Sequence, residues 1–251
     1  MKSSLNINQL SSKRSFNING YLFEYEKPLV MGILNMTPDS FYDGGKYNSI
    51  DSAISRIEGM INNGASIIDI GGCSTRPGSD IITIEEEWKR VGGIIKECSI
   101  RFKDTLFSVD TFRSEIARRS LEEGIHIIND VSGGSLDSEM FDIISKYNRP
   151  YILMHLKGTP KDMMSKTNYD DLILDLLNYF RKKINKLNSL GINDIILDPG
   201  FGFAKDFEQN FEILNNLNYY PKIAPPCTET LTPRSFNSFN ILLETPPSTI
   251  I

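Results

Sequence analysis

The sequence predicts an α/β protein built as a TIM-type (β/α)8 barrel. Six apolar, strand-like runs alternate with six segments whose apolar residues recur at helical spacing, and the links between them are short. Strands that alternate with helices imply parallel pairing and right-handed crossovers. A polar residue also stands at or near the C-terminal end of every strand-like run: Asn35, Asp69, Asp110, Asn129, His155 and Asp198.

A doubly wound open sheet is the alternative architecture. Such a sheet uses only the one or two strand ends beside its switch point. A barrel instead brings every C-terminal strand end to one mouth, where active sites are built. Six polar ends in six strands therefore favour the barrel.

The first elements follow from local signals. Residues 15–25 are predicted to form a hairpin, because Asn19-Gly20 separates two alternating runs. Residues 29–37 are an apolar run suited to a strand buried on both faces. In 49–64, isoleucines at helical spacing predict a helix that Gly64 ends.

The same strand and helix unit recurs five more times. Thr83 with Glu86 forms a capping-box pattern at the start of the second helix, Gly191 is placed to end the fifth, and Asp206 is a predicted cap of the sixth. The other strand-like runs are 66–72, 105–111, 125–131, 150–156 and 194–200. The other helix-like segments begin at Thr83 and span 113–124, 138–148, 171–191 and 207–220.

The alternation stops after Tyr220. Residues 221–251 contain half of the 12 prolines of the chain, and proline at this density opposes both helices and central strands. Only residues 239–244 are strand-like within this part. We therefore predict a flexible leader at 1–14, a barrel over 15–220, and an atypical, poorly structured tail over 221–251.

Composition narrows the class of protein. A net charge of −5 argues against a general binder of nucleic acid or membrane surfaces. The three cysteines form no CxxC pair, as is typical of reduced thiols in the cytosol. No apolar run has the length of a membrane-spanning helix, and the first residues lack the apolar core of a secretory signal. We predict a cytoplasmic protein that acts on small molecules.

Six motifs follow the six strand-like runs. In chain order they are LNMTPDSFYDGG (34–45), DIGGCSTRPG (69–78), SVDT (108–111), INDVSGG (128–134), LMHLKGTP (153–160) and LDPGFGFAK (197–205). Their sequence and order closely resemble the dihydropteroate synthase family over about residues 15–220. The resemblance implies a (β/α)8 barrel and a transferase of folate biosynthesis, which is the target of sulfonamides. Its reaction joins 6-hydroxymethyl-7,8-dihydropterin diphosphate to p-aminobenzoate and gives 7,8-dihydropteroate and pyrophosphate.

The resemblance assigns the pterin ring to three strand-end residues. Asp198 and Asn129 are expected to grip the ring, with Asp110 close to its ring nitrogens. The residue types suit this role, because a buried carboxylate accepts two N–H donors and a carboxamide both donates and accepts. The alternative interpretation is that these residues only cap the helices that follow them.

Asn35 is the implied ligand of Mg²⁺, the one cofactor that the resemblance suggests. A carboxamide oxygen is a weak, hard ligand, suited to an ion already held by diphosphate oxygens. The alternative is a turn-forming Asn-x-Thr-Pro.

The second loop carries Thr75 and Arg76, which the resemblance assigns to the diphosphate and aminobenzoate. The planar guanidinium of arginine matches carboxylate and phosphate oxygens, although a surface arginine in a Pro-Gly turn is the alternative. Met154 and Phe203 are expected to line the pterin or aminobenzoate site, or else to be ordinary core residues. The predicted catalytic residues are Asn35, Arg76 and Asp110.

Two remaining residues are interpreted as structural. His155 has no obvious proton to remove, because an arylamine is already neutral at pH 7. Cys73 occupies a position at which the resembled family varies, so we predict no nucleophile there.

The tail departs from the resembled family. That family continues with a seventh strand ending in a Ser-Arg-Lys-Ser type motif and an eighth ending in Arg-x-His, and neither motif is present after Tyr220. In the family the lysine contacts the pterin, and the arginine and histidine bind the diphosphate end. A frameshift or an early stop would produce this pattern. The late helices through which such barrels commonly form homodimers are also replaced.

Three functions therefore stay open. The first is an active synthase. The second is an inactive, truncated pterin-binding relic. The third is a pterin-binding methyltransferase, against which the MTPDSF and STRPG loops argue, because they serve diphosphate and aminobenzoate.

Overall fold

The main feature of the fold is a seven-stranded parallel sheet in which each strand pairs with the next one along the chain. The computed structural model describes residues 14–37, 48–74, 82–217 and 229–230. The strand order is β3-β4-β5-β6-β7-β8-β9. Because this order never reverses, the sheet has no switch point, and its winding is that of a barrel rather than of a doubly wound sheet. The strands are β3 (Met31–Asn35), β4 (Ile67–Gly71), β5 (Leu106–Asp110), β6 (Ile127–Asp130), β7 (Tyr151–Met154), β8 (Ile195–Asp198) and β9 (Glu229–Thr230).

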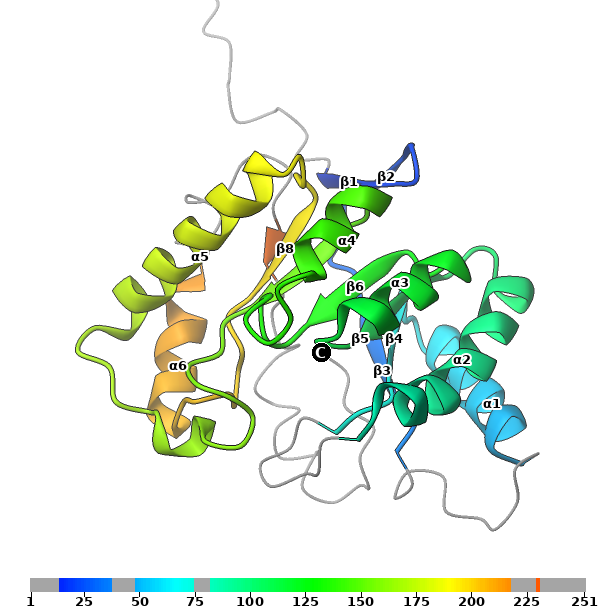
Figure 1. Ribbon diagram of the computed structural model, residues 1–251, viewed down its shortest axis with the longest axis horizontal. Coiled ribbons are helices and arrows are strands. Elements are labelled where there is room, and N and C mark those ends of the chain that lie inside the picture. Colours follow the sequence, from blue (N-terminus) through cyan, green and yellow to red (C-terminus); the bar gives the residue numbers. More distant parts are fainter. Residues whose placement is uncertain (1–13, 38–47, 75–81, 218–228, 231–251) are drawn as a thin grey trace, which may run out of the picture.

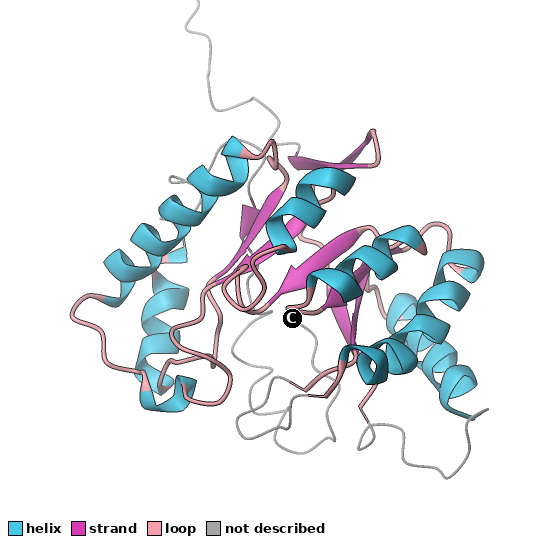
Figure 2. Ribbon diagram, viewed as in Figure 1, coloured by secondary structure: helices cyan, strands magenta, loops and turns pink. Residues whose placement is uncertain are grey.

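A helix follows each of the first six strands of this sheet, which confirms the predicted repeat of six units. The helices surround the strands on their outer side (Figure 2). They are α1 (Asn48–Asn62), α2 (Ile84–Arg101), α3 (Ser114–Glu122), α4 (Met140–Tyr147), α5 (Leu172–Ser189) and α6 (Phe207–Asn215), and a short 3-10 helix, η3 (Met163–Ser165), precedes α5.

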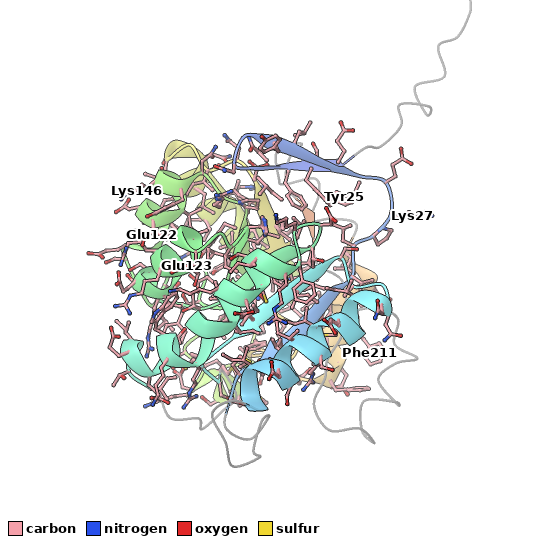
Figure 3. All side chains as sticks on the ribbon, turned by 90° about the vertical axis from the view of Figure 1, so that its right-hand side faces the viewer. Tyr25, Lys27, Glu122, Glu123, Lys146 and Phe211 are labelled. Atoms are coloured by element: carbon pink, nitrogen blue, oxygen red, sulfur yellow. The ribbon has the colours of Figure 1, made fainter. Side chains whose placement is uncertain are left out.

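The predicted helix caps are present. The Thr83 hydroxyl accepts a hydrogen bond from the Glu86 N–H at 3.2 Å, and Asp206 forms a full capping box with Gln209. Each satisfies a backbone N–H that the first helical turn leaves without a partner. The outer faces of the helices are charged; Glu122 on α3 and Lys146 on α4 lie exposed at the surface (Figure 3).

The chain enters the fold through the predicted hairpin, which is formed by β1 (Arg14–Ile18) and β2 (Tyr21–Tyr25). Asn19 and Gly20 have φ angles of 53° and 88°, the two consecutive left-handed residues that a tight two-residue hairpin turn requires. The Asn17 N–H donates to the Asp194 carboxylate at 2.8 Å and joins the hairpin to the start of β8. Figure 1 shows the hairpin, in dark blue, at the upper end of the sheet.

Two apolar clusters lie on opposite faces of the sheet. The larger cluster fills the space between the sheet and the helices. The smaller one takes Phe16 and Ile18 from the hairpin and one residue near the start of each of six strands: Met31, Ile67, Leu106, Ile127, Ile152 and Ile196. The hairpin therefore plugs the N-terminal end of the barrel interior and leaves the C-terminal strand ends for the site.

Little of the predicted tail is described. Its β9 runs parallel to β8, with Leu197 and Thr230 as partners. The predicted strand-like run at 239–244 and the predicted leader at 1–13 lie outside the described residues, and Arg14 belongs to β1. Among the described residues, no helix combines the length and apolar character needed to cross a membrane.

The same substitution at two exposed glycines is expected to have opposite effects on stability. Gly191 ends α5, as predicted, with φ 80°, whereas Gly59 lies inside α1, and an added Cβ would meet nothing within 4 Å at either position. Gly191→Ala should lower the free energy of unfolding by about 1 kcal/mol, because alanine is strained at positive φ. Gly59→Ala should raise it by about 0.5–1 kcal/mol through helix propensity. Urea unfolding of both variants tests this, and equal signs would contradict it.

Candidate active site

The site begins with the alternation of side chains along each strand, which points every second residue into the barrel. The first inward residue of each strand is apolar and belongs to the inner cluster. Two residues further on, four of the six inward positions are polar, namely Asp69 in β4, Ser108 in β5, Asn129 in β6 and Asp198 in β8, whereas Ile33 in β3 and Met154 in β7 are apolar. A polar layer thus lies on an apolar floor.

Strand register brings predicted residues together at the mouth. Asn35 pairs with Gly71, Gly71 with Asp110, and Asp110 with Asn129. A Cβ on Gly71 would lie 3.1 Å from the Asn35 Oδ1 and 3.5 Å from the Asp110 Oδ2. The glycine therefore leaves space that a side chain would take from both the Asn35 amide and the Asp110 carboxylate.

The carboxylates of the polar layer act on one another. Burial raises the pKa of Asp110 well above its ordinary value, and the charges of Asp69, Glu87, Asp130 and Asp198 raise it further. Burial likewise raises the pKa of Asp198, although the Gly200 N–H, 2.8 Å from its Oδ1, and the nearby Lys205 oppose that shift. A site of this kind favours a ligand that brings N–H donors or positive charge.

Several buried polar atoms near the strand ends lack any partner among the described residues, and two of them are acceptors of predicted site residues. Within the described part of the chain, the Asp110 Oδ1 and the Asn129 Oδ1 are buried and accept no hydrogen bond. A buried acceptor without a donor is unfavourable by about 1–3 kcal/mol. These two atoms thus point to a ligand that donates to both.

Substitution of Asp110 should separate stability from binding. A carboxyl group whose pKa is higher in the folded than in the unfolded protein stabilises the fold at low pH. This contribution is lost as the pH rises through the pKa of the folded state. Asp110→Asn should therefore raise the Tm of the ligand-free protein, and the increase should be larger at pH 8 than at pH 5. Thermal unfolding at both pH values measures it, with the exposed Asp142→Asn as the control. A uniform decrease in Tm would contradict the expectation.

A buried lysine shapes the loop after β8. The Lys205 Nζ, 2% exposed, donates to the carbonyls of Gly200 at 3.1 Å and Phe203 at 2.9 Å. It lies 3.1 Å from the His155 Nδ1. Burial, with Lys205 and Lys157 nearby, lowers the pKa of His155 to about 2, which favours the neutral imidazole beside the lysine. The lysine thus ties the Phe203 backbone to the end of β7.

The second loop is held at both described ends. The Arg90 Nη1 donates to the Gly72 carbonyl at 3.1 Å, just before the loop, and the Arg113 guanidinium donates to the Ile82 carbonyl just after it. Glu87 fixes the arginine at the second of these ends, because its carboxylate accepts from Arg113 at 2.6 Å and from Thr111 at 2.7 Å.

The structure thus brings four predicted polar residues together at the C-terminal ends of the strands, Asn35, Asp110, Asn129 and Asp198. Met154 pairs with Asp198 across the β7–β8 ladder, and Phe203 lies on the loop that follows. Thr75 and Arg76 lie outside the described residues.

Sequence reasoning did not assign roles to Asp69, Ser108, Lys205 and Glu87. The period-two pattern offered a signal for the first two, because each stands two residues before a mouth position on the same face of its strand. No pattern in the sequence pointed to Lys205 or Glu87, whose partners come from other units of the fold.

The side-chain oxygens at the mouth suit a cation that prefers oxygen ligands and that a bound substrate helps to hold. The described residues contain no group of three His, Cys, Asp or Glu side chains able to bind a metal by themselves. They do place the Asn35 amide oxygen and the Asp110 carboxylate next to the same residue, Gly71. Oxygen ligands of this kind fit Mg²⁺ that is bound mainly through phosphate oxygens.

Comparison with known proteins agrees with this geometry. The family model described as pterin binding enzyme matches residues 31–239, which include the first part of the predicted tail. The chain is 44% identical to the dihydropteroate synthase of Clostridium beijerinckii over 215 residues, covering 85% of this chain and 75% of that protein. It is 41% identical to the dihydropteroate synthase of Escherichia coli K12 over 200 residues, or 79% and 70% of the two chains.

Solved structures show the same similarity. The Yersinia pestis dihydropteroate synthase in a sulfonamide complex superposes with a TM-score of 0.78 at 35% identity, covering 91% of this chain and 82% of that one. The Xanthomonas albilineans dihydropteroate synthase with 4-aminobenzoic acid gives a TM-score of 0.80 at 30% identity, with coverage of 94% and 84%.

Proposed function

Because this chain belongs to the pterin-binding enzymes, and within them to the dihydropteroate synthases, we propose that it joins a pterin diphosphate to p-aminobenzoate. The substrate is 6-hydroxymethyl-7,8-dihydropterin diphosphate, and the products are 7,8-dihydropteroate and pyrophosphate. The observation that carries the proposal is the cluster of buried acceptors on Asp110, Asn129 and Asp198. The structure of a relative with 4-aminobenzoic acid supports the second substrate.

The pocket residues have distinct roles in this proposal. Asp198 and Asn129 hold the pterin by hydrogen bonds to its N–H groups, and Asp110 lies near the ring nitrogens. Negative charge around the ring stabilises the positive charge that develops there as the bond from the methylene carbon to the diphosphate breaks. The catalytic contribution of these residues is thus mainly electrostatic.

Met154 and Phe203 provide the apolar surfaces for the pterin or the aminobenzoate. The aminobenzoate nitrogen then attacks the methylene carbon. An arylamine is neutral at pH 7, so no base is needed to make it a nucleophile. His155, whose Nδ1 faces Lys205, is a poor proton acceptor, because burial lowers its pKa to about 2.

The diphosphate end is assigned to the first two loops. Asn35 would hold Mg²⁺ together with the diphosphate oxygens, and the ion would neutralise charge on the leaving group. Thr75 and Arg76 would bind the diphosphate and the aminobenzoate carboxylate, since a guanidinium pairs with either through two hydrogen bonds.

We further propose a cytoplasmic protein that acts on small molecules rather than on nucleic acid or membranes. The free thiols of Cys73 and Cys98 are consistent with a reducing compartment. A homodimer and sensitivity to sulfonamides are proposed from the family alone.

The experiment that tests the function is pyrophosphate release by the purified chain with Mg²⁺ and the pterin diphosphate. Release should depend on aminobenzoate, and omission of aminobenzoate is the control. A folded chain that binds the pterin without releasing pyrophosphate would favour the inactive relic.

A further inference from the structure

Beneath the mouth of the pocket, one hydrogen bond joins two side chains that are 60 residues apart. The Asn129 Nδ2 donates to the Asp69 Oδ2 at 3.0 Å. Asp69 is on β4 and Asn129 on β6, with β5 between them, so the bond passes over the inner face of β5. Asp69 is only 3% exposed. It lies one inward position below Gly71 and therefore behind the mouth layer.

This bond decides which atom of Asn129 faces the ligand. A carboxamide can present either its oxygen or its NH2 group, whereas a carboxylate only accepts hydrogen bonds. The Asp69 carboxylate therefore holds the NH2 group, and the Asn129 Oδ1 is turned away from Asp69. That oxygen is buried and has no partner among the described residues.

Three side chains at the mouth then present acceptors. The Asn129 Oδ1 joins the Asp110 Oδ1, which is also buried without a partner, and the carboxylate of Asp198. A flipped Asn129 amide would place a donor in this row instead. The polarity of the pocket thus depends on a residue behind it.

We propose that Asp69 is a positioning residue that orients the Asn129 amide with its oxygen toward the ligand, so that the pocket selects rings with adjacent N–H donors. The inference rests on the proposed function and deepens it. The preferred ring edge carries an exocyclic amino group beside a ring N–H, as a guanidine does, and a ring with acceptors there is rejected. An unmatched buried acceptor should reduce affinity about 10- to 100-fold.

Calorimetric binding of two probes tests this. The probes are 6-hydroxymethyl-7,8-dihydropterin and its analogue without the 2-amino group, and the quantity measured is the ratio of their Kd values. The unsubstituted chain should prefer the amino compound about 10- to 100-fold. Asp69→Asn should lower this ratio at least several-fold, because the introduced amide can face Asn129 with either atom, while the Asp198 carboxylate still accepts from the ligand.

Exchanging the two residues provides the decisive variant. In the double variant Asp69→Asn with Asn129→Asp, the introduced amide donates to the introduced carboxylate, which keeps an acceptor toward the ligand. The ratio should therefore recover, whereas Asn129→Asp alone, which sets two carboxylates against each other, should weaken binding of both probes. Asp194→Asn is the matched control, since Asp194 also accepts an N–H but lies at the opposite end of the barrel.

The outcomes separate the inference from the function on which it rests. An unsubstituted chain that binds neither probe would overturn both. A chain that prefers the amino compound, with the ratio unchanged by Asp69→Asn, would overturn the inference alone. If Asp69→Asn does not fold, the double variant provides the test. A folded double variant that does not restore the ratio would also overturn the inference.

Discussion

Replacing Asp198 with asparagine is expected to weaken binding of 6-hydroxymethyl-7,8-dihydropterin by about 10- to 100-fold. A hydrogen bond to a charged group contributes about 1.5–3 kcal/mol. Asparagine is nearly the same size as aspartate, but only one of its two terminal side-chain atoms can accept a hydrogen bond. The Gly200 N–H bond to the Oδ1 of residue 198 can persist in the variant. The loss should therefore come from the ligand rather than from the loop. Calorimetric titration with the pterin measures it.

The control for this prediction is Asp104→Asn, at an exposed aspartate near the start of β5, where affinity should not change. In the turnover assay, Asp198→Ala should abolish pyrophosphate release. An affinity for the pterin within twofold of the unsubstituted chain in Asp198→Asn would show that this carboxylate does not hold the ring.

Removal of the Glu87 side chain should have the largest effect on stability. Glu87 is 1% exposed and pairs with Arg113 at 2.6 Å, with the arginine side chain 12% exposed. Breaking a buried ion pair by removing one partner costs about 3–5 kcal/mol, because the other charge is left without compensation. Glu87→Ala should lower the free energy of unfolding in guanidinium by that amount.

Two further variants identify the cause of this loss. Glu86→Ala, on the neighbouring residue, removes an ion pair with Arg90 whose glutamate side chain is 42% exposed, and it should cost less than about 1 kcal/mol. The double variant Glu87→Ala with Arg113→Ala should be less destabilised than the sum of its single variants. Strict additivity would mean that the two side chains act independently.

The local structure of the fold was predictable from the sequence. Asn19-Gly20 predicted the hairpin because the turn requires two residues at positive φ, and Thr83 and Asp206 predicted helix starts because their side chains bind nearby N–H groups. The six strand and helix units were predictable for the same reason. All of these signals depend on residues within a few positions of one another.

The pocket was predictable only in part. Asn35, Asp110, Asn129 and Asp198 could be named because each stands at a strand end, within a motif that resembles a known family. Their convergence on one mouth followed from parallel strands wound in one order.

The sequence by itself thus determined the repeat of strands and helices, the caps, the turn and the family. Only the tertiary structure decided which buried polar groups meet: Asp69 with Asn129, Lys205 with His155, and Glu87 with Arg113. These partners lie 60, 50 and 26 residues apart. Their contacts depend on strand register and on the curvature of the sheet, which no local pattern encodes. The physical reason is that a buried charge or amide takes its partner from whichever element packs against it.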